Sequence, residues 1–273
     1  MSILVRSDRA LLRFSGPEAQ KLLNDVITGP VSASDDKAAW WALLSPQGKI
    51  QAEGLIGWAD AVFWLDVHAS VADDFFKRMR LYKLRAQVTI EDMRASHRVG
   101  WSAERPQSGI VHKDARAESL GYRVIDTIEA AATWDTDITP YLRARIAAGL
   151  AELGADFAAD TTFAHDIGMD ILDGIDFSKG CYVGQEVVSR MKHRGTARRR
   201  PVIVDGVAEA GSPVLAAARE AGTIGAIADG RAVGIIRLDR IVDSAQVTVG
   251  GQPVTLTLPN WATYAFGESL DND

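Results

Sequence analysis

The stretch GIDFSKGCYVGQEVVSRMKHRG, residues 174–195, contains the single cysteine of this 273-residue chain, Cys181. Its first half is too rich in glycine to form a regular element. Its second half, GQEVVSRMKH, has helix-forming residues and places Glu186 four residues before Arg190. We therefore expect Cys181 to lie in a loop just before a helix.

A lone cysteine allows three interpretations: a buried filler, a nucleophile, or one ligand of a shared site. One cysteine cannot close an intramolecular disulfide, and the five scattered histidines give no spacing typical of a zinc site. Free cysteines are often buried. At Cys181, however, the start of a helix and Lys179, two residues away, would favour the thiolate, which is the reactive and metal-binding form.

The residues around Cys181 strengthen the functional interpretations. Gly180 and Gly184 permit either a turn with positive φ or the close approach of a ligand or partner. Gln185 and Glu186 then offer polar groups in the first turn of the helix. This context favours a functional thiol over a buried filler.

On both sides of this stretch, the spacing of apolar residues and the turn-forming residues predict strands and helices. A strand over 11–16 leads into a helix over 17–28, with Ser15 as its capping residue. Residues 38–68 read as three strands in hairpin succession, and apolar spacing predicts a helix over 71–86. Strands over 87–92, 97–103 and 121–127, a polar connection over 103–118 and a helix over 139–154 complete this part. After Pro201, five or six short strands separated by glycines suggest a small β-barrel or sandwich.

Composition and charge limit the partners and the location. The net charge of −6 argues against general nucleic-acid binding, so no nucleic acid is expected as a partner. No run of 18 apolar residues occurs, so no membrane partner is expected. Charged residues at Arg6, Asp8 and Arg9 interrupt the apolar stretch that a signal peptide needs, and we expect a cytoplasmic protein.

The basic tract RMKHRGTARRR, residues 190–200, is a local exception to the acidic composition. It carries six arginine or lysine residues and one histidine without an acidic residue. A solvated linker and an anion-binding site both remain open as interpretations.

The motif KGCYVGQE resembles the signature of the YgfZ family of folate-binding proteins for iron-sulfur cluster assembly and repair, relatives of the T-protein of the glycine cleavage system. The residues in register with the signature are Lys179, Gly180, Cys181, Tyr182, Gly184, Gln185 and Glu186. LLNDVIT, ALLSPQGKI, RARIAAGL and HRGTARRR are similar to other landmarks of the family. The resemblance covers most of residues 10–200 and only loosely the C-terminal part.

The resemblance implies an α+β fold: a T-protein-like ring of subdomains around a folate channel, with a C-terminal β-barrel. Residues 1–42 plus 117–194 would form a discontinuous first subdomain, and residues 43–116 the second. Residues 195–273 would form the barrel.

The resemblance leaves two functional hypotheses. The first is a tetrahydrofolate-binding accessory factor that acts through Cys181, with Lys179 beside it, in assembly or repair of iron-sulfur clusters in client proteins. Cys181 would then be a shared ligand of a transient cluster with a carrier or client protein, since clusters take about four protein ligands, or would form a mixed disulfide. Asn24, Asp25 and Arg194 are the implied folate contacts, and the basic tract could meet a polyglutamate tail or an acidic partner.

The second hypothesis is a folate-dependent aminomethyltransferase or demethylase. Here the chain departs from the T-protein, because Ala147 stands where a glutamate grips the pterin. The catalytic carboxylate aligns with Ala52 or Glu53, and the sequence does not decide between these registers. The expected enzyme machinery is incomplete, so a classical enzyme is not our first expectation.

Overall fold

The computed structural model describes residues 2–33, 36–195 and 197–267. The strands are β1 (Leu4–Val5), β2 (Arg9–Ser15), β3 (Lys37–Leu44), β4 (Ile50–Ala59), β5 (Val62–His68), β6 (Thr89–Asp92), β7 (His97–Ser102), β8 (Ile110–Asp114), β9 (Tyr122–Thr127), β10 (Arg199–Asp205), β11 (Pro213–Ala216), β12 (Arg219–Ala228), β13 (Arg231–Arg237), β14 (Val247–Val249), β15 (Gln252–Pro253) and β16 (Thr255–Thr257). The α-helices are α1 (Ala19–Val26), α2 (Ala72–Lys83), α3 (Ile128–Ala131), α4 (Thr139–Ala147) and α5 (Gln185–Arg194).

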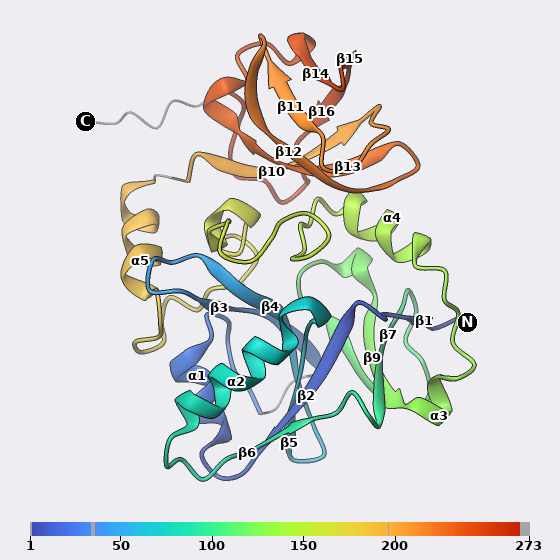
Figure 1. Cartoon of the computed structure of the whole chain (residues 1–273), viewed down its shortest axis with the longest axis vertical. Helices are drawn as coiled ribbons and strands as arrows, with labels where there is room; N and C mark the ends of the chain where they lie inside the picture. Colours follow the sequence, from blue (N-terminus) through green and yellow to red (C-terminus); the bar gives the residue numbers. More distant parts are fainter. Residues whose placement is uncertain (1, 34–35, 196, 268–273) are drawn as a thin grey trace.

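Within these described ranges the strands form two sheets. The larger has nine strands in the order β1-β7-β9-β8-β3-β4-β5-β2-β6, and the smaller has seven, all from residues after Arg199. Figure 1 shows the smaller sheet at one end of the long axis, with α5 on one side of the molecule beneath it. The mixture of helices and strands agrees with the predicted α+β class.

The centre of the nine-stranded sheet corrects one prediction from the sequence. Residues 103–118, expected as a connection, contain β8, which pairs in parallel with β3 and antiparallel with β9. Residues 103–109 do form the expected connection and are mostly exposed. From β8 onward, the polar side chains of His112, Asp114 and Arg116 are buried and have partners: His112 lies within 3.0 Å of the Trp58 carbonyl oxygen, and Asp114 pairs with Arg116. At these positions of the second half, polarity did not indicate exposure. This sheet contains strands from both predicted subdomains. The division of the chain into these subdomains therefore stays a prediction.

Helices α1 and α2 cover the β2–β5 part of this sheet. Leu23 of α1 and Phe75 of α2 belong to the same apolar core as Phe14, and Trp41 stacks on Phe75 with ring centroids 4.9 Å apart. The prediction that Ser15 caps the first helix is wrong, since Ser15 ends β2 and the chain turns at a glycine before α1 begins at Ala19.

The C-terminal barrel (β10–β16) shares a core with the rest of the chain. Val233 and Ile235 of β13 belong to the same apolar cluster as Trp40 and Leu44 of β3. The barrel also has its own core of valine, isoleucine and leucine side chains. It has seven strands in the described residues, where the sequence indicated five or six. In the described ranges, no helix has the length and apolar character needed to cross a membrane.

Candidate functional site

The cysteine loop, residues 178–184, precedes α5. Cys181 is a free and exposed thiol, and Gly184 is the residue that caps the helix N-terminus. This confirms the expected position in a loop before a helix and removes the buried-filler interpretation. The thiol is open to a partner or a reagent.

Lys179 ties the cysteine loop to the segment after α1. Its Nζ donates hydrogen bonds to the backbone oxygens of Ile27 and Gly29, the second at 2.8 Å. Burial lowers the pKa of Lys179 to about 8, against the opposing effects of Asp176 and Asp25. The sequence suggested that this cation serves the thiolate, whereas the structure gives its amine two carbonyl acceptors. Lys179 is therefore a positioning residue for the cysteine loop.

Replacing Lys179 with methionine is expected to lower the free energy of unfolding by about 1–3 kcal/mol, because two backbone oxygens lose their donor. Urea unfolding of both proteins measures this loss. Lys37→Met, which changes an exposed lysine of β3, is the matched control and should have a much smaller effect.

The stabilisation by Lys179 is also expected to depend on pH. Its pKa is about 8 in the folded chain and 10.5 in the reference state, so the unfolded chain binds more protons between these values. The free energy of unfolding of the wild type therefore increases as the pH is raised from about 8 to about 10.5. The difference between wild type and Lys179→Met should grow from about pH 7.5 to about pH 10.5. A constant difference would contradict this expectation.

Two glycines of the motif have different environments. Gly184 has φ +82°, and a Cβ there would lie 2.8 Å from Leu44 Cβ and from the Ser45 oxygen. The positive φ that the sequence allowed occurs at this glycine, and the close approach there is by the chain itself and not by a ligand or partner. Gly180 has open space where a Cβ would stand, so it leaves the neighbourhood of Cys181 uncovered.

The other motif residues anchor the loop and begin the helix. Tyr182 is buried in the core shared with the barrel, and burial raises its pKa to about 12. Gln185 Nε2 reaches the Gly180 oxygen at 3.5 Å. Glu186 forms the predicted ion pair with Arg190 at 2.6 Å. The motif thus places the exposed Cys181 thiol on a loop that the buried Tyr182 side chain anchors to the core.

The three implied folate contacts lie on two helices. Asn24 is half-buried on α1, and Asp25 is exposed beside it, where it pairs with Lys21 at 2.5 Å. Arg194 is the exposed last residue of α5. Among the described residues, no hydrogen bond or ion pair joins any two of Asn24, Asp25 and Arg194. Their role in folate binding stays a prediction.

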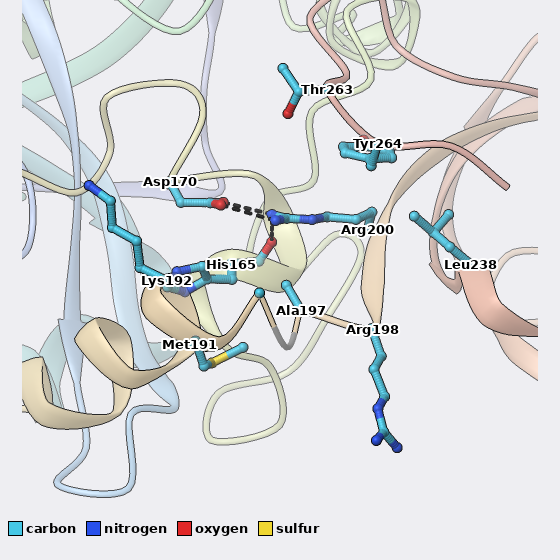
Figure 2. Close-up of a pocket in the computed structure, with 11 residues that line it drawn as sticks. His165, Asp170, Met191, Lys192, Ala197, Arg198, Arg200, Leu238, Thr263 and Tyr264 are labelled. Atoms are coloured by element: carbon cyan, nitrogen blue, oxygen red, sulfur yellow. Dashed lines mark hydrogen bonds and ion pairs between the residues drawn. The ribbon is translucent and has the colours of Figure 1, made fainter. Parts of the chain in front are cut away.

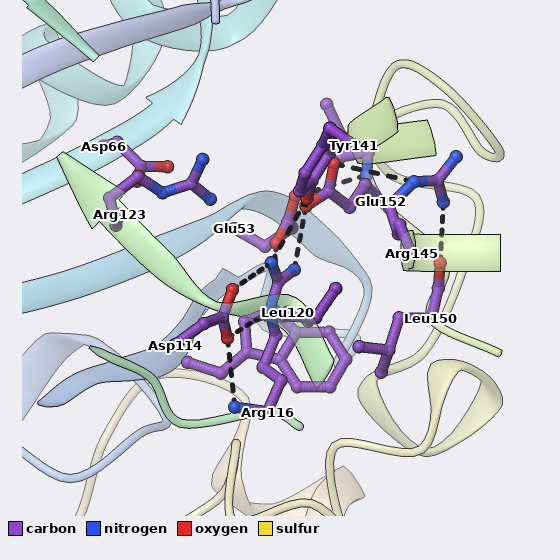
Figure 3. A network of polar contacts seen from close by, with 12 residues as sticks. Glu53, Asp66, Asp114, Arg116, Leu120, Arg123, Tyr141, Arg145, Leu150 and Glu152 are labelled. Atoms are coloured by element: carbon purple, nitrogen blue, oxygen red, sulfur yellow. Dashed lines mark hydrogen bonds and ion pairs between the residues drawn. The ribbon is translucent and has the colours of Figure 1, made fainter. Parts of the chain in front are cut away.

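A buried network of charged side chains is the feature that the sequence analysis missed. At its centre, Glu152 accepts hydrogen bonds from Arg6 at 2.9 Å, from Arg116 at 2.8 Å and from the Tyr141 hydroxyl. Figure 3 shows Arg145 and Tyr141 converging on this carboxylate from one side, with Arg116 and Asp114 on the other. Burial would raise the pKa of Glu152, but the guanidinium groups of Arg6 and Arg116 outweigh it and hold the pKa well below its usual range.

Glu53 belongs to the same network and not to an open site. It has no solvent exposure, and its oxygens accept hydrogen bonds from Arg9 at 3.3 Å, Trp40 Nε1 at 2.9 Å and the Leu153 amide at 3.2 Å. Ala147 is exposed at the end of α4. Neither of these positions offers an accessible catalytic carboxylate. A lone acidic residue in the apolar strand IQAEGLIGWA was the signal that could have indicated a buried ion pair.

Four arginines of this interior, Arg6, Arg9, Arg123 and Arg145, retain donors without a hydrogen-bond partner among the described residues. The Nε atoms of Arg9 and Arg123 lie 3.0 and 2.9 Å from the carboxylate oxygens of Asp66, without the alignment of a hydrogen bond. Nη2 of Arg9 and both Nη atoms of Arg123 are buried without a hydrogen-bond partner among the described residues.

Comparisons with known proteins support the assignment of a C-terminal barrel and identify proteins that are similar in sequence to this chain. Residues 197–264 match the family model of the CAF17 C-terminal beta-barrel domain. The chain is 31% identical over 211 residues to the mitochondrial iron-sulfur cluster assembly factor IBA57 homolog of Pyricularia oryzae, covering 70% of this chain and 54% of the relative. The corresponding protein of Chaetomium globosum is 31% identical over 253 residues, covering 77% of this chain and 58% of the relative. The chain therefore spans little more than half the length of these relatives.

A solved structure shows the same fold. The crystal structure of glycine cleavage system aminomethyltransferase T from Bartonella henselae matches with a TM-score of 0.75, covering 97% of this chain and 87% of that chain at 14% sequence identity. This confirms the predicted T-protein-like fold with a C-terminal barrel. At this identity the match shows the fold alone.

The expected cytoplasmic location is wrong, because these curated relatives are named as mitochondrial. The expectation used the charges near the start of the chain. In the structure Arg6 and Arg9 are buried and paired with Glu152 and Glu53. These charges serve the fold and carry no information about the compartment.

Proposed function

We propose that this chain is an assembly factor for iron-sulfur clusters that acts through Cys181. The observation that carries the proposal is a free, exposed thiol on a loop held by Lys179 and Tyr182, in a chain similar to iron-sulfur cluster assembly factors. The narrower resemblance of KGCYVGQE to the YgfZ family is part of the same proposal.

One exposed thiol can supply one ligand to a cluster, and clusters usually take about four protein ligands. No group of three or more histidine, cysteine, aspartate or glutamate side chains suited to a metal ion occurs among the described residues. The remaining ligands would come from a carrier or client protein, or from an external thiol. The same accessibility suits thiol–disulfide exchange, in which the Cys181 thiolate attacks a disulfide of the partner, forms a mixed disulfide with one sulfur and releases the other as a thiolate. The mixed disulfide would keep Cys181 and the partner in contact during transfer.

The assembly role is tested by cluster formation on a client protein. The apo form of an iron-sulfur enzyme is incubated anaerobically with a cluster donor, with and without the full chain, and recovery of the client's own activity is followed. We expect the chain to increase the rate of recovery. An unchanged rate across the concentrations tested would count against the proposal.

Tetrahydrofolate binding is the second part of the proposal. The resemblance of KGCYVGQE to the folate-binding YgfZ family supports it. The residues do not suit folate chemistry, because Glu53 is fully engaged and Ala147 has no polar side chain. We therefore propose tetrahydrofolate as a bound ligand and not as a reactant.

We expect tetrahydrofolate to raise the melting temperature without being converted. A ligand that binds the folded state alone stabilises it by about 2.7 kcal/mol at a hundredfold excess over Kd. An anaerobic thermal titration measures the shift, and product analysis after incubation with glycine-derived or methylated amines measures conversion. No shift would remove folate from the proposal. Sustained formation of 5,10-methylenetetrahydrofolate that is lost in Glu53→Gln would instead support the aminomethyltransferase alternative.

A further inference from the structure

Two cavities adjoin at the junction of α5 with the C-terminal barrel. One has a volume of about 200 Å³ and is lined by His165, Asp170, Lys192, Arg200 and neighbouring residues. The other has a volume of about 340 Å³ and is lined by residues that include Lys49, Asp166, Arg199 and Arg237. Met191 and Arg198 line both cavities. We call the two together the basic cleft.

Some cations of the basic cleft already have partners. Arg200 forms a two-point ion pair with Asp170, at 2.7 and 3.0 Å, and donates to the His165 carbonyl oxygen, as Figure 2 shows. Arg237 pairs with Asp239 at 2.6 Å. These arginines hold the walls of the cleft together and are not free to receive a ligand.

Other cations of the basic cleft lack an acidic partner. Arg198 and Arg199 have exposed side chains with no hydrogen bond or ion pair among the described residues. In Figure 2, the side chain of Arg198, the residue just before β10, extends away from the Arg200–Asp170 pair. Lys49 and Lys192 lie over the rings of Phe163 and Phe177, each with Nζ 3.4 Å from the ring centroid. Lys49 Nζ also donates to the Thr161 carbonyl oxygen at 2.9 Å. Carboxylates act on these cations only from beyond ion-pair distance, Asp166 on Lys49 and Arg199, and Asp239 on Arg198.

One carboxyl group, Asp166, lines the second cavity among four basic side chains. Asp166 is buried, and burial raises its pKa although the Phe163 amide donates to it at 3.1 Å. The chain as a whole has a net charge of −6. A concentration of unpaired cations in cavities of an acidic protein indicates an anionic ligand.

His165 provides an independent sign of a ligand. Its side chain lines the first cavity and is 1% exposed, yet neither ring nitrogen has a hydrogen-bond partner among the described residues. Burial lowers its pKa, so the neutral ring carries one N–H donor. Buried polar groups are normally hydrogen-bonded, and an oxygen atom of a ligand would give this donor its acceptor.

We propose that the basic cleft binds a small ligand with two or more oxyanion groups, either carboxylates or phosphates. One group would be held in the first cavity by Lys192 and the His165 N–H, and another in the second cavity by Lys49 and Arg199. Arg198, between the two, would contact both groups. The site is independent of the proposed cluster and folate chemistry and lies at the opposite end of α5 from Cys181.

Calorimetric titration of the full chain tests the proposal. Inorganic pyrophosphate, citrate and tri-L-glutamate serve as probes, so that the phosphate and carboxylate sources are distinguished and no probe contains a pterin. We expect at least one probe to bind, and its affinity to fall when sodium chloride is raised from about 20 to about 200 mM, since added salt screens exposed charges.

The variant pair Arg198→Ala with Arg199→Ala is expected to weaken binding by about tenfold or more, because two charge-assisted contacts are lost. Arg219→Ala with Arg240→Ala changes the net charge equally on exposed barrel residues that line neither cavity, and should leave the affinity unchanged. In an NMR titration the ring signals of His165 should shift, while those of His112, buried beside Trp58, should not.

Three outcomes would overturn the proposal. They are the absence of binding by all three probes, an equal loss of affinity in both variant pairs, and unshifted ring signals of His165 in the complex. Because none of the probes is a folate, failure here leaves the thermal titration with tetrahydrofolate unaffected.

Discussion

Replacing Glu152 with alanine is expected to lower the free energy of unfolding by about 3–5 kcal/mol, because removal of one partner leaves buried charges uncompensated. The side chains of Arg6 and Arg116 are 1% and 0% exposed, so water cannot replace the lost carboxylate. The Tyr141 hydroxyl loses its acceptor as well. Urea unfolding followed by circular dichroism measures the change.

Glu118→Ala is the matched control for this variant. Glu118 also pairs with a basic residue, Lys113 at 3.0 Å, but its side chain is 94% exposed. Exposed pairs contribute about 0–1 kcal/mol, so this variant should unfold almost as the wild type does. If Glu152→Ala lost no more than Glu118→Ala, the buried network would not be a main source of stability. If Glu152→Ala did not fold at all, Glu152→Gln would keep the volume of the side chain and remove its charge.

Cys181→Ser is expected to abolish cluster delivery to a client protein and to leave the fold intact. The thiol is exposed, so its replacement removes no core packing. The melting temperature should therefore shift by only a few degrees, on the scale of about 1 kcal/mol or less. A serine hydroxyl cannot take the place of a thiolate as an iron ligand or in disulfide exchange. Client activity and thermal melting, measured on the same preparations, separate the two effects.

Moving the thiol within the loop gives a sharper control. Ser178 is also exposed in the cysteine loop, so Ser178→Cys combined with Cys181→Ser keeps one accessible thiol at a shifted position. We expect this double variant to remain inactive if the geometry set by Lys179 and Gly184 matters. Full activity of Cys181→Ser would refute the role of the thiol, and full activity of the double variant would show that its position is unimportant.

The cysteine loop shows what local sequence could predict. Helix-forming residues and the Glu186–Arg190 spacing located α5, and the glycine-rich segment before it located the loop with Cys181. The positive φ at Gly184 was also among the conformations that its missing side chain allowed. Each of these inferences concerned residues close in sequence, where spacing and conformational preference decide the structure. The wrong prediction at Ser15 shows the limit of such local patterns, because α1 begins at Ala19 and its N-cap residue is Glu18.

Resemblance to a family extended this local information to the whole fold. KGCYVGQE and the other landmarks led to the T-protein-like fold with a C-terminal barrel, and the structural match confirms that prediction. The resemblance could not predict the state of single residues. Glu53 is one of the two positions, with Ala52, that align with the catalytic carboxylate of the related enzyme, and here it is buried among hydrogen-bond donors.

By itself, the sequence determined the order of most elements, the loop that carries Cys181 and the fold class. The tertiary structure alone decided where the charges lie. Arg6, Arg116 and Glu152 are distant in sequence, and the two residues of β8 that pair with β3 sit in a segment that appeared too polar for a strand. The physical reason is that charge neutralisation and hydrogen bonding in the interior depend on which distant groups meet, whereas loop and helix propensities depend on neighbours along the chain.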